Sequence, residues 1–599
     1  MKFGSQLKDA LKALGLGAPK KPEPPESASG SAWPGSRAPN ENPGRRPTGR
    51  SEPEARREFP QVRRASPAPT DHIPMPGGTR SATLPLSTRK TPVIARPVPV
   101  VNPPRPNTRL TQIDAFRPHP LFQDDPGDDA ALPALANRGI ERQLTADPDN
   151  ETDLIIGLDF GTSATKVIIR DPLAATGVFP ARLNGGRPGI DGHLLPSRIF
   201  RTGDAYSLAQ GTHRITDLKL RLLACKAKSP VTEFNDCCAF LAFVIRRARG
   251  WLLSEHKDIY GNHALNWRLN LGLAARSYQD NDTVTLFRRL AWAAANLAAD
   301  PEAESITVQT ADYYRLASLA VSEEKGPEEV EFGWGDVDAV PEVSAQLQGF
   351  MSSARWDWRS RPVMMLVDVG AGTVDSALFH VQMPQDGQGV LTFYSSRVES
   401  NGAMNLHRAR VDWLQALMPP GREHAKADEH LSAIAKPTDR LRPIPESVRD
   451  YLPGYEIELV GKGIDEEFGT GRYRTQVAGS INDAKVGKGL PASQLDRVPL
   501  LLCGGGSRMK FYGGIGKAIN DTPGWNVSVE VMRLPVPQDL VDTGWHADDF
   551  DRLSVAYGLS LAGNGETTLG RIVRDIDVPE VKPYRSLKRE DNFVSKDQM

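Results

Sequence analysis

A short hairpin pattern occurs twice in this chain of 599 residues, and this repetition constrains the fold more than any other feature. In 154–169 an apolar, β-prone run ends at Asp159, a polar turn follows, and a second apolar run begins. In 363–379 the same order recurs around Asp368, 209 positions (368 minus 159) further along. Apolar runs that flank a polar turn predict two buried strands joined by a tight connection. Each hairpin can therefore head its own lobe, so the chain is expected to hold two similar α/β halves.

Both turns have the residue types that hold phosphate oxygens, because glycine lets the backbone approach a ligand closely and exposed N–H groups bind anions. The residues concerned are Gly161, Thr162 and Ser163 in the first turn and Gly370, Ala371, Gly372 and Thr373 in the second. Asp159 and Asp368 stand where the strands end, a good place for carboxylates that organise a hydrated Mg²⁺. Two such loops facing each other would clamp a polyphosphate.

A third stretch, 500–509, runs from an apolar strand into a glycine-rich turn. Its glycines leave a flat floor for a base or a ribose, and an arginine can stack its guanidinium on an aromatic face. The predicted nucleoside-binding residues are Gly504, Gly505, Gly506, Ser507 and Arg508.

These three stretches, in this order, resemble the actin, sugar-kinase and heat-shock-chaperone ATPase superfamily. They are most similar to the nucleotide-binding domain of the seventy-kilodalton heat-shock (DnaK-type) chaperones, in which 159–163 looks like the first phosphate loop, 368–375 like the second and 504–509 like the adenosine loop. The resemblance spans about 154–563. It implies a two-lobed, duplicated actin-like (ribonuclease H-like) α/β ATPase fold with ATP or ADP and Mg²⁺ as cofactors.

Shorter matches between these loops carry the implied catalytic roles. Leu195-Pro196-Ser197 and Asp217-Leu218-Lys219 resemble the chaperone's Pro-Ser strand and its Asp-x-Lys, so Lys219 is expected to orient the attacking water or the γ-phosphate. The stretch 340–345 resembles the first connecting helix of the chaperones. Glu342 is therefore expected to hold a water molecule bound to Mg²⁺. Val555-Ala556-Tyr557-Gly558 resembles the helix after the adenosine loop. By the same resemblance Thr373 hydrogen-bonds the γ-phosphate, and Asp159 and Asp368 hold Mg²⁺ through water. A solvated helix lysine is the alternative interpretation of Lys219.

The sequence departs from the chaperone pattern in 402–499, which has no clear copy of the Lys-Arg-x-x-Ser helix that packs on adenine. A remodelled subdomain is expected there, and the identity of the base stays open. After Gly563 only 36 residues (599 minus 563) remain, too few for a substrate-binding domain and lid.

The leading hypothesis is an ATP-driven, chaperone-like conformational switch without a substrate-binding domain. An actin-like filament, or a nucleotide-bound scaffold without turnover, is one alternative. A small-molecule kinase is another, because 157–166 also resembles a sugar-kinase opening.

Composition restricts the expected binding partners and cellular location of the protein. The formal net charge of −1 argues against a general nucleic-acid binder, so no nucleic-acid partner is expected. Four cysteines without metal-ligand spacing fit a reducing compartment. The start of the chain has no continuous apolar signal region, and no run approaches the roughly 20 apolar residues of a membrane span. The predicted location is the cytoplasm.

The N-terminal part of the chain differs from the rest in its composition. Residues 18–150 are predicted to be disordered, since 23 of the chain's 49 prolines fall within the first 120 residues and Lys and Arg exceed Asp and Glu there by 20 to 9. Residues 1–17 form a short basic amphipathic pattern, suited to an anionic membrane surface or a partner's groove. Lobe I is expected over 151–360, with long helices over 239–253 and 286–297 and an acidic surface loop over 323–336. Lobe II is expected over 361–570, with the helix at 550–563 packing back towards lobe I. Residues 571–599 are an expected disordered tail.

Truncation tests the predicted role of the N-terminal arm, residues 1–150. Deletion of 1–120 should leave ATP binding and the thermal stability of the core nearly unchanged, because a disordered tether contributes no packing. Co-localisation with a membrane or an unidentified protein partner should be lost, as it should in the double variant Leu7→Asp and Leu11→Asp. If removal of the arm melts the core, the predicted boundary is wrong.

Overall fold

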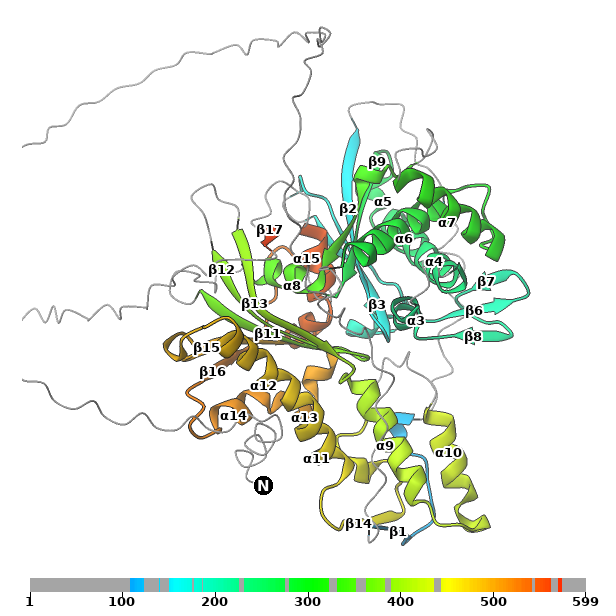
Figure 1. Cartoon of the computed structure of the whole chain (residues 1–599). Helices are drawn as coiled ribbons and strands as arrows, with labels where there is room; N and C mark the ends of the chain where they lie inside the picture. Colours follow the sequence, from blue (N-terminus) through cyan, green and yellow to red (C-terminus); the bar gives the residue numbers. More distant parts are fainter. Residues whose placement is uncertain are drawn as a thin grey trace, which may run out of the picture. The chain divides into compact units, whose positions relative to one another are not determined.

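A computed structural model describes residues 108–122, 139–140, 150–174, 177–185, 187–225, 231–274, 280–322, 331–351, 362–382, 389–435, 443–540, 544–561 and 569–573. The expected amphipathic helix 1–17 and most of the expected disordered regions lie outside these residues. The described chain is built on two six-stranded sheets with helices around them (Figure 1), which confirms the predicted mixed α/β class. No helix within these ranges is long and apolar enough to cross a membrane.

The first sheet has the strand order β10-β9-β2-β3-β4, and β5 pairs with β3. Strands β10, β9 and β2 are parallel, whereas β3 runs antiparallel to β2 and β4 antiparallel to β3. The predicted first hairpin is therefore the pair β2 and β3. The bounds are β2 Glu151–Phe160, β3 Ala164–Arg170, β4 Val178–Pro180, β5 Leu195–Pro196, β9 Ala264–Leu273 and β10 Val337–Pro341.

The second sheet, in the order β16-β15-β11-β12-β13-β17, repeats this arrangement. Strands β16, β15 and β11 are parallel, and β12 and β13 follow as an antiparallel meander. The strands β10-β9-β2-β3-β4 of the first sheet therefore correspond to β16-β15-β11-β12-β13 of the second, with the same directions and the same order along the chain. The bounds are β11 Val363–Val369, β12 Val374–Gln382, β13 Gly389–Glu399, β15 Val498–Cys503, β16 Val529–Met532 and β17 Leu569–Val573.

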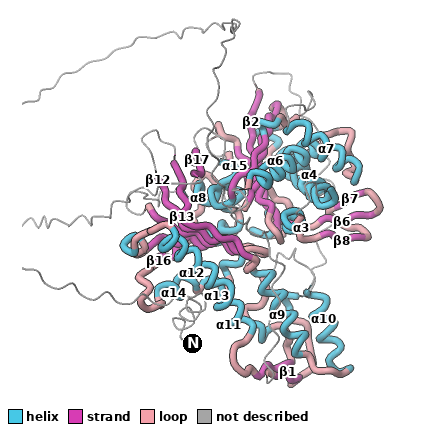
Figure 2. Tube along the Cα trace, viewed as in Figure 1, coloured by secondary structure: helices cyan, strands magenta, loops and turns pink. Residues whose placement is uncertain are grey.

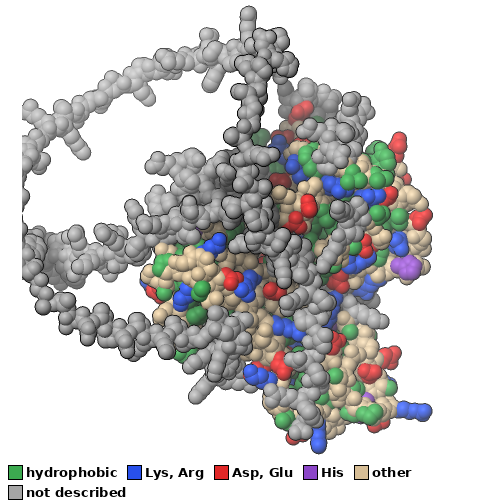
Figure 3. Space-filling view, viewed as in Figure 1, with side chains coloured by type: hydrophobic (Ala, Val, Ile, Leu, Met, Phe, Trp, Pro, Cys, Tyr) green, Lys and Arg blue, Asp and Glu red, His purple; other side chains and the backbone are tan. Residues whose placement is uncertain are grey.

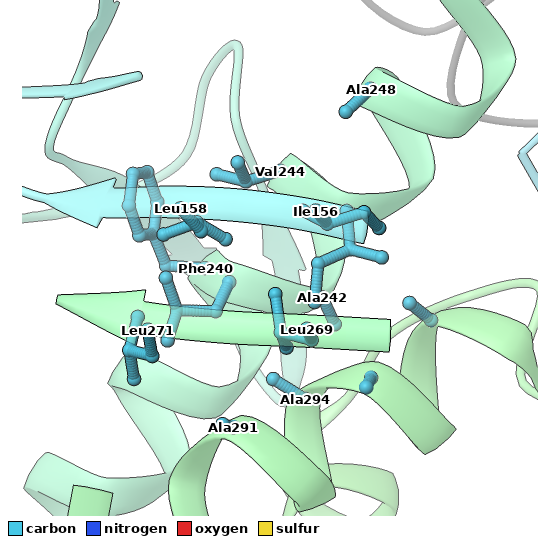
Figure 4. Close-up of a cluster of buried hydrophobic side chains, with 14 of the residues drawn as sticks. Ile156, Leu158, Phe240, Ala242, Val244, Ala248, Leu269, Leu271, Ala291 and Ala294 are labelled. Carbon is cyan, nitrogen blue, oxygen red and sulfur yellow. The ribbon is translucent and has the colours of Figure 1, made fainter. Parts of the chain in front are cut away.

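Long helices bury the apolar side chains of the first sheet. Ile156 and Leu158 of β2 and Leu269 and Leu271 of β9 pack against α4 and α6, whose alanines allow close approach (Figure 4). The helices predicted over 239–253 and 286–297 are the central parts of α4 and α6, which extend further in both directions. The helices around this sheet are α3 Leu218–Ala224, α4 Val231–Glu255, α5 Lys257–Tyr260, α6 Asn281–Ala299 and α7 Val308–Ser322.

A nearly continuous helical run leads from α11, which packs on α9, to α12, which lies along the second sheet (Figure 2). Gln476 and Ser480 of α12 bond to the backbone of β12 at Val374 and Ser376, which fixes the helix on the strands. One π-helical turn, Gly469–Tyr473, joins α11 to α12, and a second, Asp483–Gly487, follows α12. The remaining bounds are α9 Ala403–Leu417, α10 Ala425–Ala435, α11 Ile464–Phe468, α12 Arg474–Asn482, α13 Lys510–Gly513 and α14 Ile515–Asn520.

Two helices, α8 (Glu342–Met351) and α15 (Ser554–Leu561), lie between the two sheets (Figure 1). Helix α8 packs on the second sheet through Val343 and Leu347, while α15 packs on β2 of the first. The helices cross with almost no side-chain volume between them, because a Cβ on Gly558 would lie 1.7 Å from the Ala345 carbonyl oxygen. Each helix follows the last parallel strand of one sheet, so the crossing joins the two repeated halves.

Residues 108–122 correct the predicted boundary of the arm. They fall within the region expected to be disordered, yet β1 (Arg109–Gln112) pairs with β14 (Tyr455–Glu458), and Leu110 and Phe122 are buried. Average composition missed them because a few apolar side chains are enough to dock a segment on an existing surface. The truncation that tests the arm therefore has to end before residue 108.

Two smaller regions complete the fold. Strands β6 (Ile199–Thr202), β7 (Ala205–Ser207) and β8 (His213–Ile215) form a separate antiparallel sheet. Residues 331–336 are the described end of the acidic surface loop predicted over 323–336, and they are half-exposed or exposed apart from the buried Phe332. Charged side chains of both signs are interspersed over the visible face of the described residues (Figure 3).

The helix crossing predicts a large effect of one methyl group. Gly558→Ala should lower the free energy of unfolding by about 3 kcal/mol or more, since α8 and α15 must separate to admit a Cβ. Denaturant titration of the full chain measures this change.

Gly471→Ala is the matched control, because Gly471 is also helical and no atom lies within 4 Å of its Cβ position. This substitution should be neutral or stabilise by up to about 1 kcal/mol. Equal stability of the two variants would show that the crossing is not closely packed.

Candidate functional site

The first turn is fixed by Ser197, in the predicted Pro-Ser strand. The Ser197 hydroxyl donates to the Gly161 carbonyl at 2.7 Å, and the Ser197 N–H donates to the Ser163 carbonyl at 2.9 Å. In a trans peptide the C=O and the following N–H point in opposite directions, so the Thr162 N–H points away from Ser197. A side chain at Gly161 would meet the Ala164 carbonyl, 2.4 Å from the Cβ position, which explains the glycine.

The second turn is held in the same way, by the N-terminus of α9. The Gly370 carbonyl accepts from the Ala403 N–H at 3.0 Å, and the Ala371 carbonyl accepts from the Met404 N–H at 2.8 Å. The Gly372 carbonyl accepts from the Asn405 side chain at 2.5 Å. With three successive carbonyls directed at α9, the N–H groups of the following residues, 371–373, are directed away from it. Such a run of N–H groups is an anion-binding arrangement.

The two turns contact each other. The Thr162 hydroxyl lies 3.0 Å from the position that a Cβ on Gly372 would take, and the Leu220 side chain of α3 lies 3.1 Å from it. Helix α3 also reaches the second half through its preceding residue, since Asp217 forms an ion pair of 2.9 Å with Arg408 of α9. The predicted phosphate loops are therefore neighbours, with an ion pair between the halves beside them.

A cluster of charged side chains lies next to these loops. Lys219 is buried and donates to Glu342, the first residue of α8. This excludes the alternative that Lys219 is a solvated helix lysine. Lys166, opposite Asp159 in the hairpin, donates to the Asp159 carboxylate at 2.8 Å.

The second hairpin places Asp375 opposite Asp368. Gln346 of α8 donates to Asp368 at 2.6 Å. Among the described residues, Asp375 Oδ1 and Gln346 Oε1 are buried without a hydrogen-bond partner. The cluster thus holds four carboxylates, on residues 159, 342, 368 and 375, against two lysines.

The pKa shifts of these side chains reflect the repulsion between the buried carboxylates. Burial, with the nearby Glu342 and Asp159 carboxylates, raises the pKa of Asp368 to about 7. Burial and the charges of Glu342 and Asp368 raise the pKa of Asp375 well above its usual range. Burial by itself lowers the pKa of Lys219, but the attraction of Glu342, Asp159 and Asp375 outweighs burial and raises that pKa. A bound cation would relieve this repulsion.

The third predicted loop lies beside the second because β15 pairs with β11, with Cys503 opposite Asp368. Gly504 has a φ of +79°, and a Cβ there would lie 2.1 Å from the Asp368 carboxylate. A glycine is required on both counts.

Ser507 and Arg508, which follow Gly504 in the loop, form hydrogen bonds within the protein. The Ser507 hydroxyl donates to the Gly504 carbonyl at 2.7 Å, which closes the turn. Arg508 donates at 2.6 Å to both Asp549 and Asp551, which use the edge of its guanidinium. Stacking of the guanidinium face on a base stays a prediction.

The structure adds residues to the site that the sequence did not single out. Lys166, Asp375 and Gln346 carry or contact the charged cluster, and Arg408 bridges the two halves beside it. The first three could have been found from the hairpin pairing and from the helical spacing of Gln346 after Glu342. Arg408 gives no such signal, because its partner is 191 positions away.

Comparison of the chain with protein-family models gives no match, and comparison with curated proteins gives none either. Within the described ranges, no group of three His, Cys, Asp or Glu side chains is placed to hold a metal ion directly.

The charged cluster predicts that stability depends on pH. The pKa of Asp368 is about 7 in the folded chain and near 4 in the unfolded chain, so the folded chain binds more protons between these values. Stability should therefore fall by about 1 kcal/mol between pH 6 and pH 8, in buffer without divalent cations. Thermal melts at the two pH values measure this fall.

Asp368→Asn should reduce the fall between pH 6 and pH 8 and melt higher than the native chain at pH 8. Asp521→Asn, which changes an exposed aspartate in the second half, should leave both melts unchanged. A native chain that is equally stable at pH 6 and pH 8 would mean that Asp368 is already ionised at pH 6.

Proposed function

We propose that this chain is an Mg·ATP-binding conformational switch with a two-lobed, duplicated actin-like (ribonuclease H-like) fold. The observation that carries the proposal is the pair of turns whose carbonyls are bonded away from each other, to Ser197 in one half and to α9 in the other. Their N–H groups at 162 and 371–373 are left for an anion held between the halves. The repeated strand order of the two sheets supports the duplication.

Mg²⁺ fits the charged cluster by its chemistry. The cluster has more carboxylates than lysines, and two of its buried oxygens lack a partner among the described residues. Asp159 and Asp368 are the residues that would hold the ion through water, in line with the preference of Mg²⁺ for oxygen ligands and retained waters. When bound, the ion neutralises charge on the polyphosphate.

Lys219 is the residue assigned to turnover. Glu342 accepts a hydrogen bond from the Lys219 ammonium and so orients it, and that ammonium would donate to the attacking water or to the γ-phosphate. Glu342 would also hold a water of the Mg²⁺ ion. Thr373 donates to the γ-phosphate from the second turn, and the Gly504 to Gly506 loop with Arg508 receives the nucleoside. Phosphoryl transfer requires positioning and charge stabilisation more than covalent chemistry, which such a set supplies.

Switching follows from the contact between the turns. The Thr162 side chain lies so near Gly372 that an added Cβ there would be 3.0 Å from it, so a polyphosphate that enters between them separates the turns. The Asp217–Arg408 ion pair lies in the path of that movement, and the α8–α15 crossing is the element about which the halves rotate. Binding of ATP is in this way converted into a change of the angle between the lobes.

Calorimetry with the full chain tests the proposal. Mg·ATP should bind, and Asp159→Ala or Asp368→Ala should weaken binding by about tenfold or more, because each removes a carboxylate that organises the ion. No heat with Mg·ATP, together with strong heat from another nucleotide, would overturn the adenine assignment.

Hydrolysis is measured on the same samples. Lys219→Ala should leave binding nearly intact and lower turnover by about a hundredfold, as loss of a transition-state contact does. Lys517→Ala, on an exposed position of α14, is the matched control and should not change turnover. An unchanged rate in Lys219→Ala would remove Lys219 from the mechanism.

A further inference from the structure

The segment 108–122 is docked on the second half of the chain by strand addition. Strand β1 pairs antiparallel with β14, with Leu110 opposite Ile457 and Gln112 opposite Tyr455. The N–H groups of the next two residues, 113 and 114, both donate to the Gly454 carbonyl, at 2.9 and 3.0 Å. Strands β1 and β14 form a sheet of their own, so within the described residues β1 is the ladder partner of β14.

Gly454 shapes the surface for this segment. Its φ is +94°, a conformation that side chains disfavour. A Cβ there would lie 2.9 Å from the backbone oxygens of both Asp114 and Ala115. A residue other than glycine would therefore strain the turn before β14 and collide with the docked segment.

Three apolar side chains at successive intervals of six positions attach the segment: Leu110, Phe116 and Phe122. The Phe122 ring lies 5.2 Å from the ring of Tyr451 and 5.5 Å from that of His407. The Phe116 ring lies 5.3 Å from that of His430 on α10. Most of the other side chains of the segment are exposed, including Ile113 at 66%.

The receiving surface is held together by its own bonds. His407 of α9 bonds to the Tyr451 hydroxyl at 2.9 Å and to the Ile434 carbonyl of α10 at 2.8 Å. Arg410, also on α9, lies over the Tyr451 ring and pairs with Asp465 at 2.6 Å. These contacts do not involve 108–122, so they preorganise the site. Figure 1 shows β1 beside β14, near α9 and α10.

We propose that the surface formed by β14, α9 and α10 is a docking site for an extended peptide and that residues 108–122 are its resident ligand. The site recognises a backbone that adds to β14 and an apolar side chain followed by aromatic side chains six and twelve positions later. A second peptide with this pattern displaces 108–122. The mode is strand addition, in which backbone bonds give affinity and pockets for separate side chains give specificity.

Competition in the full chain tests the proposal. The probe is a fluorescent synthetic peptide of residues 108–122, followed by anisotropy. The intact chain should bind the probe weakly, because its own segment acts as a tethered competitor at high effective concentration. The full-length double variant Phe116→Ala and Phe122→Ala should bind the probe at least about tenfold more tightly.

Two controls identify the site. Gly454→Val, added to the double variant, should abolish binding of the probe. A probe with Ala at both Phe positions should bind neither protein. If the folded double variant binds the probe no better than the intact chain, the proposal is overturned.

Hydrogen exchange of the unaltered chain gives a measure that does not depend on a variant. The amides of 109–114 should exchange at least about tenfold faster than those of β11, because a resident ligand opens locally without unfolding the lobe. Exchange as slow as that of β11 would make 108–122 an integral part of the lobe and would overturn the proposal.

Discussion

The close crossing of α8 and α15 is the constraint on which the rest of the structure depends. Each helix belongs to one repeated half, and their backbones meet at Gly558 and Ala345 with no room for a side chain. Because α8 packs on the second sheet and α15 on the first, the crossing connects the two sheets. Glu342 begins α8, so the same contact delivers a carboxylate to the place where the two hairpin turns come together.

The site that results is built from buried charge, which proteins tolerate only when it is paired or used. Lys219 and Lys166 pair with Glu342 and Asp159, but Asp368 and Asp375 are left with raised pKa values and an excess of negative charge. A packing argument alone does not account for two acidic residues opposite each other on neighbouring strands. A bound cation would offset this excess of negative charge, which is why the cluster supports the proposed function alongside the two turns.

Helix α9 connects the second hairpin turn with the surface that receives 108–122. Its N-terminus holds the turn at 370–373, its Arg408 reaches Asp217, and one residue earlier His407 faces the docked Phe122. Composition predicts disorder for the whole arm because proline and charge dominate the average. A docked segment escapes that average, since polar residues and two prolines separate its three apolar side chains and leave no continuous strand or helix pattern.

The sequence by itself determined the hairpins, the long helices and the glycines of the turns, because strand, turn and helix patterns are local and each repeats within a few residues. It also placed Lys219 and Glu342 among the candidate site residues, although only by resemblance. The tertiary structure decided which charges meet, through partners that lie far apart in sequence: Lys219 with Glu342, Arg408 with Asp217, and Arg508 with Asp549 and Asp551. It also decided that 108–122 belongs to the folded part, because β14 supplies hydrogen bonds and Tyr451 and His407 supply a surface that no local pattern near Phe122 encodes.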